Sequence, residues 1–129
     1  MNKILITAGL LLGVTGIVLG AFAAHGLKSL IDEASIKSFE TGVRYQMYHA
    51  FLLIILGATS FVSKKIKTIV FYLVLLGVLC FSFSIYGLAT NDLSSINFKS
   101  IAFVTPIGGL LLISAWLFIL VHVLKSKVN

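Results

Sequence analysis

The sequence predicts an all-α protein, an integral membrane four-helix bundle with its N and C termini on the same, cytoplasmic side. Of its 129 residues, 59% are hydrophobic and only 11% are charged, whereas a soluble domain carries roughly a quarter charged residues. The charged residues also separate four apolar blocks, each long enough for the roughly 20 residues that a helix needs to cross a bilayer. A single proline and short connections indicate one domain over residues 1–129.

The four predicted spans are residues 4–24, 45–63, 68–90 and 101–124. Backbone amides find no partner in lipid, so continuous apolar runs of this kind are expected to be helices. The first run follows Lys3 and ends in small residues, which also resembles a secretory signal peptide with its cleavage site. Because its apolar stretch is longer than a usual signal core, we expect it to be the first span.

Orientation follows from the basic residues of the short loops, which concentrate on the cytoplasmic side of a membrane. An even number of spans puts both termini on one side, which holds Lys3, Lys64, Lys65, Lys67, Lys125 and Lys127. The other side holds Lys28, Lys37, Arg44 and Lys99, together with the acids Asp32, Glu33, Glu40 and Asp92. The excess of lysines places both termini in the cytoplasm. The basic residues form no face with interleaved aromatics, so the net charge of +6 does not indicate a nucleic-acid partner.

Residues 27–44 form the one sizeable polar connection, and we predict an extracytoplasmic surface helix or a helical extension of the second span. Ser35 can cap the start of this helix. Apolar residues then recur at helical spacing, at Ile36, Phe39, Val43 and Met47. The second helix therefore begins outside the lipid.

The start of the fourth helix has two alternatives. Thr105 and Pro106 suit the cap and first position, because proline lacks the amide hydrogen that would be unpaired there. In that case residues 97–104 dip into the interface. Otherwise the helix starts near Lys99 and is kinked at Pro106.

Small residues recur at spacings of three and four along one stripe of the first span, at Gly9, Gly13, Gly16 and Gly20. Lipid gives helices no hydrophobic reason to associate, so such stripes allow close backbone contact. We expect the stripe to pack within the chain, against Gly108 and Gly109 of the fourth helix. Packing against a second copy of the chain is the alternative.

Polar residues inside the second span should point into the bundle, because polar groups facing lipid are costly. Gln46 and His49 share one face of that span. We predict a polar cluster near the outer surface, made of His25, Arg44, Gln46, His49 and Thr105, with Tyr45, Tyr48 and Tyr86 as aromatic neighbours.

Three roles are open for this cluster. The simplest is structural: His and Gln bond across helices, Tyr lies in the interfacial belt, and Arg44 snorkels or pairs with Glu40. A proton-titrating or solute-binding site comes second. Metal or haem ligation through His25 and His49 comes last, because no Cys, Asp or third His lies nearby in the sequence. We therefore expect no cofactor and no metal.

Catalytic patterns are not found. The spans hold no paired carboxylates, no Ser or Cys with a base beside it, and no phosphate-binding glycine loop, so we do not expect an enzyme. Transport would need at least a dimer, and no span holds the acidic residue typical of cation-coupled exporters.

Three motifs occur in order: GAFAAHGL at residues 20–27, FETGVRYQMYHA at 39–50, and TPIGG at 105–109 with Trp116 after it. Over nearly its whole length the chain resembles the small bacterial inner-membrane family that includes YgdD and YwdK. That family is catalogued as domain of unknown function 423 and is related to the eukaryotic transmembrane protein 256. Two positions depart from the family pattern, since Ala23 and Phe83 stand where the family often has glycine.

The resemblance implies a multi-pass protein of the bacterial inner membrane and implies no activity. It marks as characteristic positions His25, Arg44, Tyr45, Gln46, His49, Thr105 and Pro106. We predict a structural or accessory membrane protein, with the lipid bilayer and either a second copy or another membrane protein as partners. The alternative is an oligomeric channel or transporter for protons or a small solute that uses the polar cluster.

Overall fold

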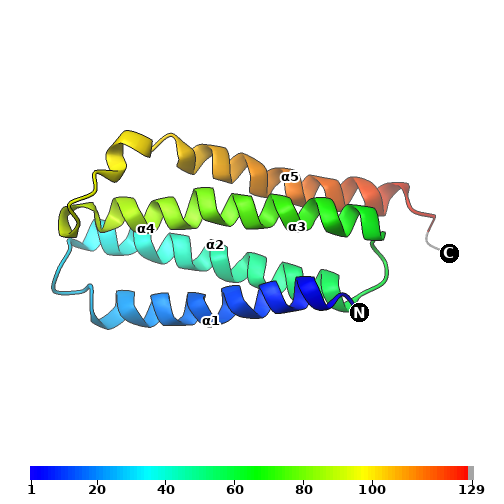
Figure 1. The fold of residues 1–129 in the computed structure, drawn as a ribbon, viewed down its shortest axis with the longest axis horizontal. Coiled ribbons are helices and arrows are strands. Elements are labelled where there is room, and N and C mark those ends of the chain that lie inside the picture. Colours follow the sequence, from blue (N-terminus) through cyan, green and yellow to red (C-terminus); the bar gives the residue numbers. More distant parts are fainter. Residues whose placement is uncertain (128–129) are drawn as a thin grey trace.

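The computed structural model describes residues 1–127, and they are helical with short connections. The α-helices are α1 (Lys3–His25), α2 (Glu33–Ala58), α3 (Lys64–Val78), α4 (Ser84–Ala89) and α5 (Val104–Lys125). A π-helical turn, η1 (Leu79–Phe83), joins α3 to α4, and two 3-10 turns, η2 (Asn91–Leu93) and η3 (Phe98–Ile101), lead to α5. Since α3, η1 and α4 form one continuous helix, the chain makes four long rods (Figure 1).

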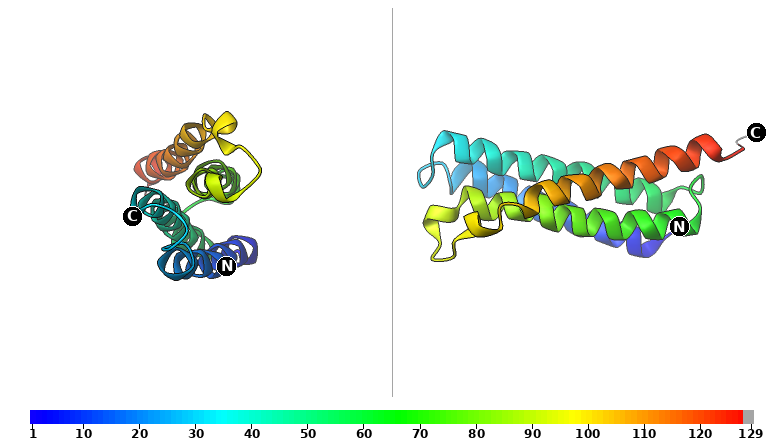
Figure 2. Two further views of the ribbon diagram at one scale, coloured as in Figure 1. Left: turned by 90° about the vertical axis from the view of Figure 1, so that its left-hand side faces the viewer. Right: turned by 90° about the horizontal axis from the view of Figure 1, so that it is seen from above.

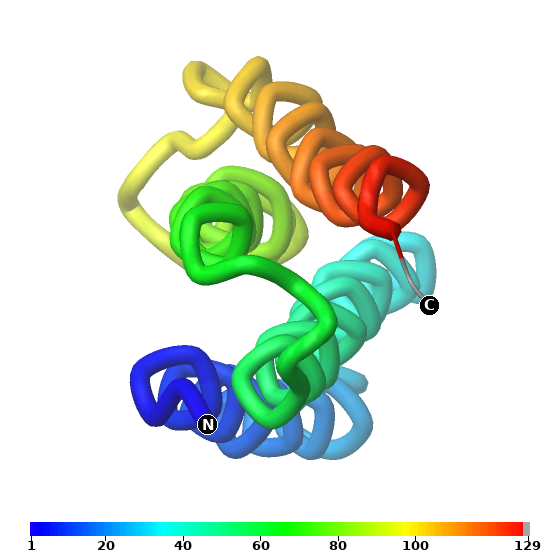
Figure 3. The backbone as a smooth tube through the Cα atoms, turned by 90° about the vertical axis from the view of Figure 1, so that its right-hand side faces the viewer, coloured from blue at the N-terminus to red at the C-terminus, as the bar shows by residue number. Residues whose placement is uncertain are grey.

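Each rod runs antiparallel to the next along the chain, so α1 begins at the same end where α5 ends (Figure 1). The main contacts are between α1 and α2, between α2 and the α3–α4 rod, and between α3 and α5. Views along the rods show α2 and the α3–α4 rod lying between α1 and α5 (Figures 2 and 3). We call this arrangement the helix array. Its outer rods, α1 and α5, each have one well-packed neighbour.

Two apolar clusters hold the helix array together. The larger one joins all four rods and contains Leu5, Leu52, Leu53, Leu56, Val62, Val70, Val74, Val78, Leu112 and Ala115. The smaller one lies at the opposite end from the termini and contains Ala23, Leu27, Phe39, Tyr86 and Ala89. Many large apolar side chains, such as Val14 on α1 and Leu110 on α5, instead point outward. Lipid is the solvent in which such an exterior is stable.

Among residues 1–127, three helices are long and apolar enough to cross a membrane: Lys3–His25, Lys64–Ala89 and Val104–Lys125. The helix α2 is not one of them, although a span at 45–63 was expected within it. That predicted span also ends too late, because α2 stops at Ala58 and Thr59 caps it in extended conformation. Of the polar segment 27–44, the part from Glu33 onward is the start of α2, so it is a helical extension rather than a separate helix.

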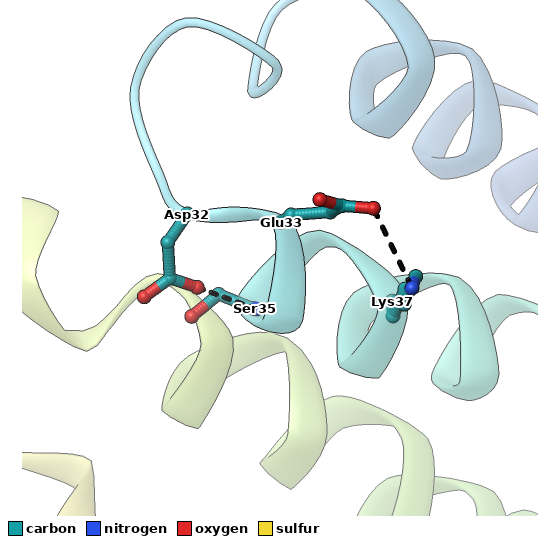
Figure 4. Close-up of polar contacts among 4 residues, drawn as sticks. All are labelled: Asp32, Glu33, Ser35 and Lys37. Carbon is teal, nitrogen blue, oxygen red and sulfur yellow. Dashed lines mark hydrogen bonds and ion pairs between the residues drawn. The ribbon is translucent and has the colours of Figure 1, made fainter.

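The start of α2 is capped by Asp32, so the prediction that Ser35 caps it is wrong. The Asp32 carboxylate accepts a hydrogen bond from the Ser35 amide at 2.7 Å, and this bond lowers the pKa of Asp32 (Figure 4). One turn along, Lys37 and Glu33 form an exposed ion pair of 3.5 Å (Figure 4). An aspartate at the cap also interacts favourably with the positive end of the helix dipole.

The start of α5 follows neither of the two alternatives. The helix begins at Val104, two residues before Pro106, and residues 98–101 form the short turn η3. Pro106 therefore occupies the third helical position. The first amides of a helix have no intrahelical acceptor, so proline fits there without a kink.

The glycine stripe of α1 packs against α2 of the same chain. A Cβ added to Gly9 would lie 2.7 Å from the Ala50 carbonyl oxygen, and one added to Gly16 would lie 2.6 Å from the sulfur of Met47. At Gly20 the nearest atom, on Val43, is at an ordinary 3.4 Å, and Gly13 has nothing within 4 Å. Half of the stripe is thus a close contact.

The predicted partners of that stripe, Gly108 and Gly109, lie elsewhere. A Cβ on Gly108 would be 2.3 Å from the backbone nitrogen of Phe81, so this glycine lets α5 approach the π-helical turn. Gly109 has only ordinary contacts with the Phe81 ring, at 3.8 Å. The prediction of a glycine contact between the first and fourth helices is therefore wrong.

Candidate functional site

Gln46 is fully buried and joins three rods. Its amide nitrogen donates to the Leu12 carbonyl at 2.9 Å and to the Thr15 hydroxyl at 2.8 Å, both on α1. Its amide oxygen accepts from the Tyr86 hydroxyl on α4 at 2.7 Å. Leu12 and Thr15 lie near the middle of the 23 residues of α1, so this polar contact is at mid-length of the helix array.

The α4 side of this contact is held by a second buried hydrogen bond. The Ser82 hydroxyl, in the π-helical turn, donates to the Gly42 carbonyl at 2.7 Å. Gly42 has no side chain because the Tyr86 ring takes that space, with an added Cβ only 2.7 Å from it. Gly42 thereby lets Tyr86 reach Gln46.

His49 lies on the same buried face of α2 and points to α5. Its Nδ1 is 2.6 Å from the Tyr45 carbonyl oxygen, and its Nε2 accepts a hydrogen bond from the Trp116 indole at 3.1 Å. A carbonyl can only accept, so the ring proton is assigned to Nδ1. Both ring nitrogens are occupied in the neutral tautomer.

Thr105 makes a separate contact. Its hydroxyl lies 2.6 Å from that of Ser84, which also bonds to the carbonyl of Cys80. This pair fastens the start of α5 to the start of α4. It does not include Gln46 or His49.

His25 and Arg44, the remaining members of the predicted cluster, are exposed. His25 ends α1 ten residues beyond Thr15, which is about 15 Å along a helix. The Arg44 guanidinium donates to the Thr41 hydroxyl at 3.0 Å, and the ion pair with Glu40, one of its two predicted alternatives, is not formed. The prediction of one cluster near the outer surface is therefore wrong, because Gln46 and His49 are deep and His25 is not.

Exposed aromatic side chains cover the seam between α2 and α5. We call Tyr45, Tyr48, Phe51 and Trp116 the aromatic face. Tyr45 and Tyr48 pack edge to face at 5.6 Å, and Tyr48 and Trp116 are 52% and 50% exposed. Since both tyrosines flank Gln46 in sequence, they lie at mid-length of the helix array and not in an interfacial belt as predicted.

Two cavities open on this face, and Trp116 lines both. One, of about 430 Å³, is lined by His49, Phe81, Leu112 and other apolar residues. The other, of about 720 Å³, is lined by Tyr48, Phe51, Ile55 and their neighbours. His49 borders both, but its ring nitrogens are already hydrogen-bonded and the walls are almost entirely apolar.

Metal ligation has no geometric basis in the predicted pair, because His25 and His49 lie far apart along the helix array. Within residues 1–127, no group of three or more His, Cys, Asp or Glu side chains is placed to hold a metal ion.

Lys67 is a buried residue that sequence reasoning assigned only to topology. It is 7% exposed, and its ammonium group donates to the Thr59 carbonyl. Its helical spacing to Val70 and Val74, which are both fully buried, was the signal for this inward position.

Comparisons with known proteins agree on one family. A family model described as "Protein of unknown function (DUF423)" matches residues 19–109. The chain is 36% identical to the UPF0382 membrane protein SH2409 of Staphylococcus haemolyticus over 123 residues, which is 95% of this chain and 97% of that protein. It is 34% identical to a UPF0382 membrane protein of Haemophilus influenzae, over 98% of this chain and 97% of that protein. It is 32% identical to YwdK of Bacillus subtilis, over 95% and 98%. No solved structure matches.

Proposed function

This chain belongs to the DUF423 family of proteins of unknown function, and from that premise we propose that it is a structural or accessory protein of the bacterial inner membrane. It acts through helix contacts with another membrane protein or a second copy of itself. In this proposal the four rods form a four-helix bundle that crosses the membrane four times. Both termini are cytoplasmic, since the end of the helix array that holds them carries the larger number of lysines.

The proposal that α2 spans rests on its register with α1. At one end the Asn2 amide donates to the Gly57 carbonyl at 2.7 Å, and at the other the rings of Phe22 and Phe39 are 6.5 Å apart. The roughly 20 residues between these points rise about 30 Å, the thickness of the hydrocarbon core. A membrane that α1 crosses is therefore also crossed by α2, whose Gln46 and His49 side chains are covered by neighbouring rods.

The observation that carries the proposed role is the aromatic face. Tyr45 and Tyr48 are 40% and 52% exposed at the depth where lipid offers no hydrogen-bond acceptor, and neither hydroxyl is bonded within residues 1–127. A helix of a second protein can cover the rings and supply an acceptor. Tyr and Trp are also the residues enriched where proteins bind one another.

The buried polar network has a structural role in this proposal. Within residues 1–127, no buried side-chain nitrogen or oxygen lacks a hydrogen-bond partner. Gln46 and His49 therefore use their donors and acceptors to fasten α2 to α1, α4 and α5.

Site-specific photocrosslinking in intact membranes tests the role. A photoreactive amino acid at Phe51 on the aromatic face is compared with one at Ile17 on α1, since both side chains are exposed. We expect a discrete protein adduct from position 51 and lipid adducts alone from position 17. Lipid adducts alone from both positions, or the same protein adducts from both, would contradict the proposal.

A second candidate, an oligomeric channel or transporter, is favoured by the cavity of about 430 Å³ that reaches His49 and by the π-helical turn beside it. Such turns are frequent at functional sites. Proton and small-ion flux into liposomes would be measured for wild type, His49→Ala and Arg44→Ala. Flux above empty vesicles that is lost in His49→Ala would establish this candidate in place of the first. The absence of flux would remove it.

A further inference from the structure

A cavity of about 750 Å³ opens at the end of the helix array where α1 begins and α5 ends. It lies between the start of α1, the loop from α2 to α3 and the first turns of α3. Its polar lining consists of three lysines, four hydroxyl residues and one asparagine: Lys3, Lys64, Lys67, Thr59, Ser60, Ser63, Thr68 and Asn2. We call it the lysine pocket.

Lys67 places a charge inside this pocket rather than at its rim. The residue is 7% exposed, and its ammonium group donates to one neutral acceptor, the Thr59 carbonyl. An ammonium group has three N–H donors, so two remain for other groups. Burying a charge without a counter-charge is unfavourable, and an anion in the pocket would relieve that cost.

Within residues 1–127, the charged side chains at this end of the helix array are all basic. All four acidic side chains of the sequence, Asp32, Glu33, Glu40 and Asp92, lie in the first turns of α2 or in the loop after α4, at the opposite end of the helix array. The pocket also contains the start of α3, where Ser63 caps the helix by accepting from the Ile66 amide at 3.4 Å. The amides and dipole at a helix start favour a bound anion in addition to the lysines.

The floor of the pocket is held in place. The Ser63 amide donates to His122 Nε2 on α5 at 3.2 Å, which ties the α2–α3 loop to the opposite rod. Val62 beside it is buried in the larger apolar cluster. The loop that carries Thr59 and Ser60 is thus anchored at two points.

From this geometry we infer that the lysine pocket binds an anionic phosphate group, as carried by the headgroup of an anionic phospholipid or as free phosphate. The pocket lies where the apolar spans end, which is the depth of lipid headgroups. Basic pockets between transmembrane helices on the cytoplasmic side are suited to anionic headgroups. Lys67 would contact the phosphate from inside, and Lys3 and Lys64 from the rim.

The test uses the full-length protein, purified in a nonionic detergent and freed of bound lipid. Three probes are added: phosphatidylglycerol, phosphatidylcholine with the same acyl chains, and inorganic phosphate. Native mass spectrometry measures the lipids, and the shift in thermal unfolding measures phosphate. The variants are Lys64→Gln and Lys67→Gln, with Lys65→Gln as the matched control, because Lys65 is the next residue of the same turn and does not line the pocket.

We expect phosphatidylglycerol to bind at least about fivefold more tightly than phosphatidylcholine. Lys64→Gln should weaken binding about fivefold, the effect of one surface lysine, and Lys67→Gln about tenfold or more. Lys65→Gln should change it less than about twofold. Displacement of the lipid by inorganic phosphate would identify the free ion as a ligand of the same site, and its failure would identify the lipid as the source.

Two results would overturn the inference. One is equal binding of both lipids with no response to phosphate. The other is an equal loss in Lys64→Gln and Lys65→Gln, which would show attraction by overall charge only. If Lys67→Gln does not fold, the comparison of positions 64 and 65 still decides between these outcomes.

Discussion

Replacing Gln46 with leucine removes the polar contact that joins α1, α2 and α4 while keeping a side chain of similar size. Three interhelical hydrogen bonds are lost, each worth roughly 0.6 kcal/mol inside a membrane protein. Tyr86 is only 8% exposed. Its hydroxyl is then left without an acceptor, at a further cost of about 1 kcal/mol. We expect Gln46→Leu to lower the free energy of unfolding by about 2–3 kcal/mol.

The assay is reversible unfolding in mixed micelles, followed by circular dichroism as a denaturing detergent is titrated. Tyr86→Phe is the second variant, because phenylalanine keeps the ring and needs no acceptor. It should cost about 1 kcal/mol alone, since the Gln46 oxygen loses its donor. In the double variant neither partner is left unpaired, so its loss should be smaller than the two single losses combined by about 1 kcal/mol.

A loss below about 0.5 kcal/mol in Gln46→Leu would refute the reasoning. Strictly additive losses in the double variant would do so as well, since they would show that the two side chains do not share a bond.

Three further predictions concern other contacts. Gly9→Ala should destabilise the protein by about 1–3 kcal/mol in the same assay, because the new methyl group meets the Ala50 carbonyl. The control, Gly13→Ala, should cost less than about 0.5 kcal/mol, because the surroundings of Gly13 are open. Trp116→Phe should remove the donor to His49 Nε2, and 15N NMR should show a neutral imidazole protonated at Nδ1 in wild type and a shifted Nε2 resonance in the variant. The hydrogen bond from Ser35 lowers the pKa of Asp32 from the ordinary 3.8. The stability that this bond contributes is therefore complete above pH 3.8 and is lost as the pH falls through the lowered pKa. When stability is measured from about pH 6 to about pH 3, wild type should lose this contribution, and Asp32→Ala should show no such loss.

The sequence predicted the positions of the helices well in those segments that lipid forces to be helical. Long uncharged runs become helices because their amides have no other partner, and α1, the α3–α4 rod and α5 follow. The end of α2 was misplaced because Phe61 and Val62 are apolar but lie in a loop, where Val62 packs into the core and Phe61 is exposed. Hydropathy does not distinguish those two uses of an apolar residue.

The predicted polar cluster shows a different limit. The positions of charged residues determine which membrane side a segment faces, but depth depends on the register between helices. Close contacts set that register: Gly9 against Ala50, and Gly57 against Asn2. They place Gln46 beside Leu12 and Thr15 at mid-length of α1 and leave His25 beyond them.

The partners of single residues also depend on how the rods are arranged. Gly108 was expected to face α1, but α5 packs on α3, so the close approach is to Phe81. Trp116 was noted only as part of a motif, and its bond to His49 joins residues 67 positions apart in the chain. Spacing within one helix identifies a face and does not identify what covers it.

The central claim is that α2 crosses the membrane in spite of its polar first half. In a variant lacking Cys80, single cysteines at Ser35 and at Ser60 mark the two ends of α2 and are labelled with a membrane-impermeant maleimide in intact cells. We predict labelling at position 35 without permeabilisation and at position 60 only after it. Labelling of both positions from the same side would show that α2 does not span, and would contradict the four-span account.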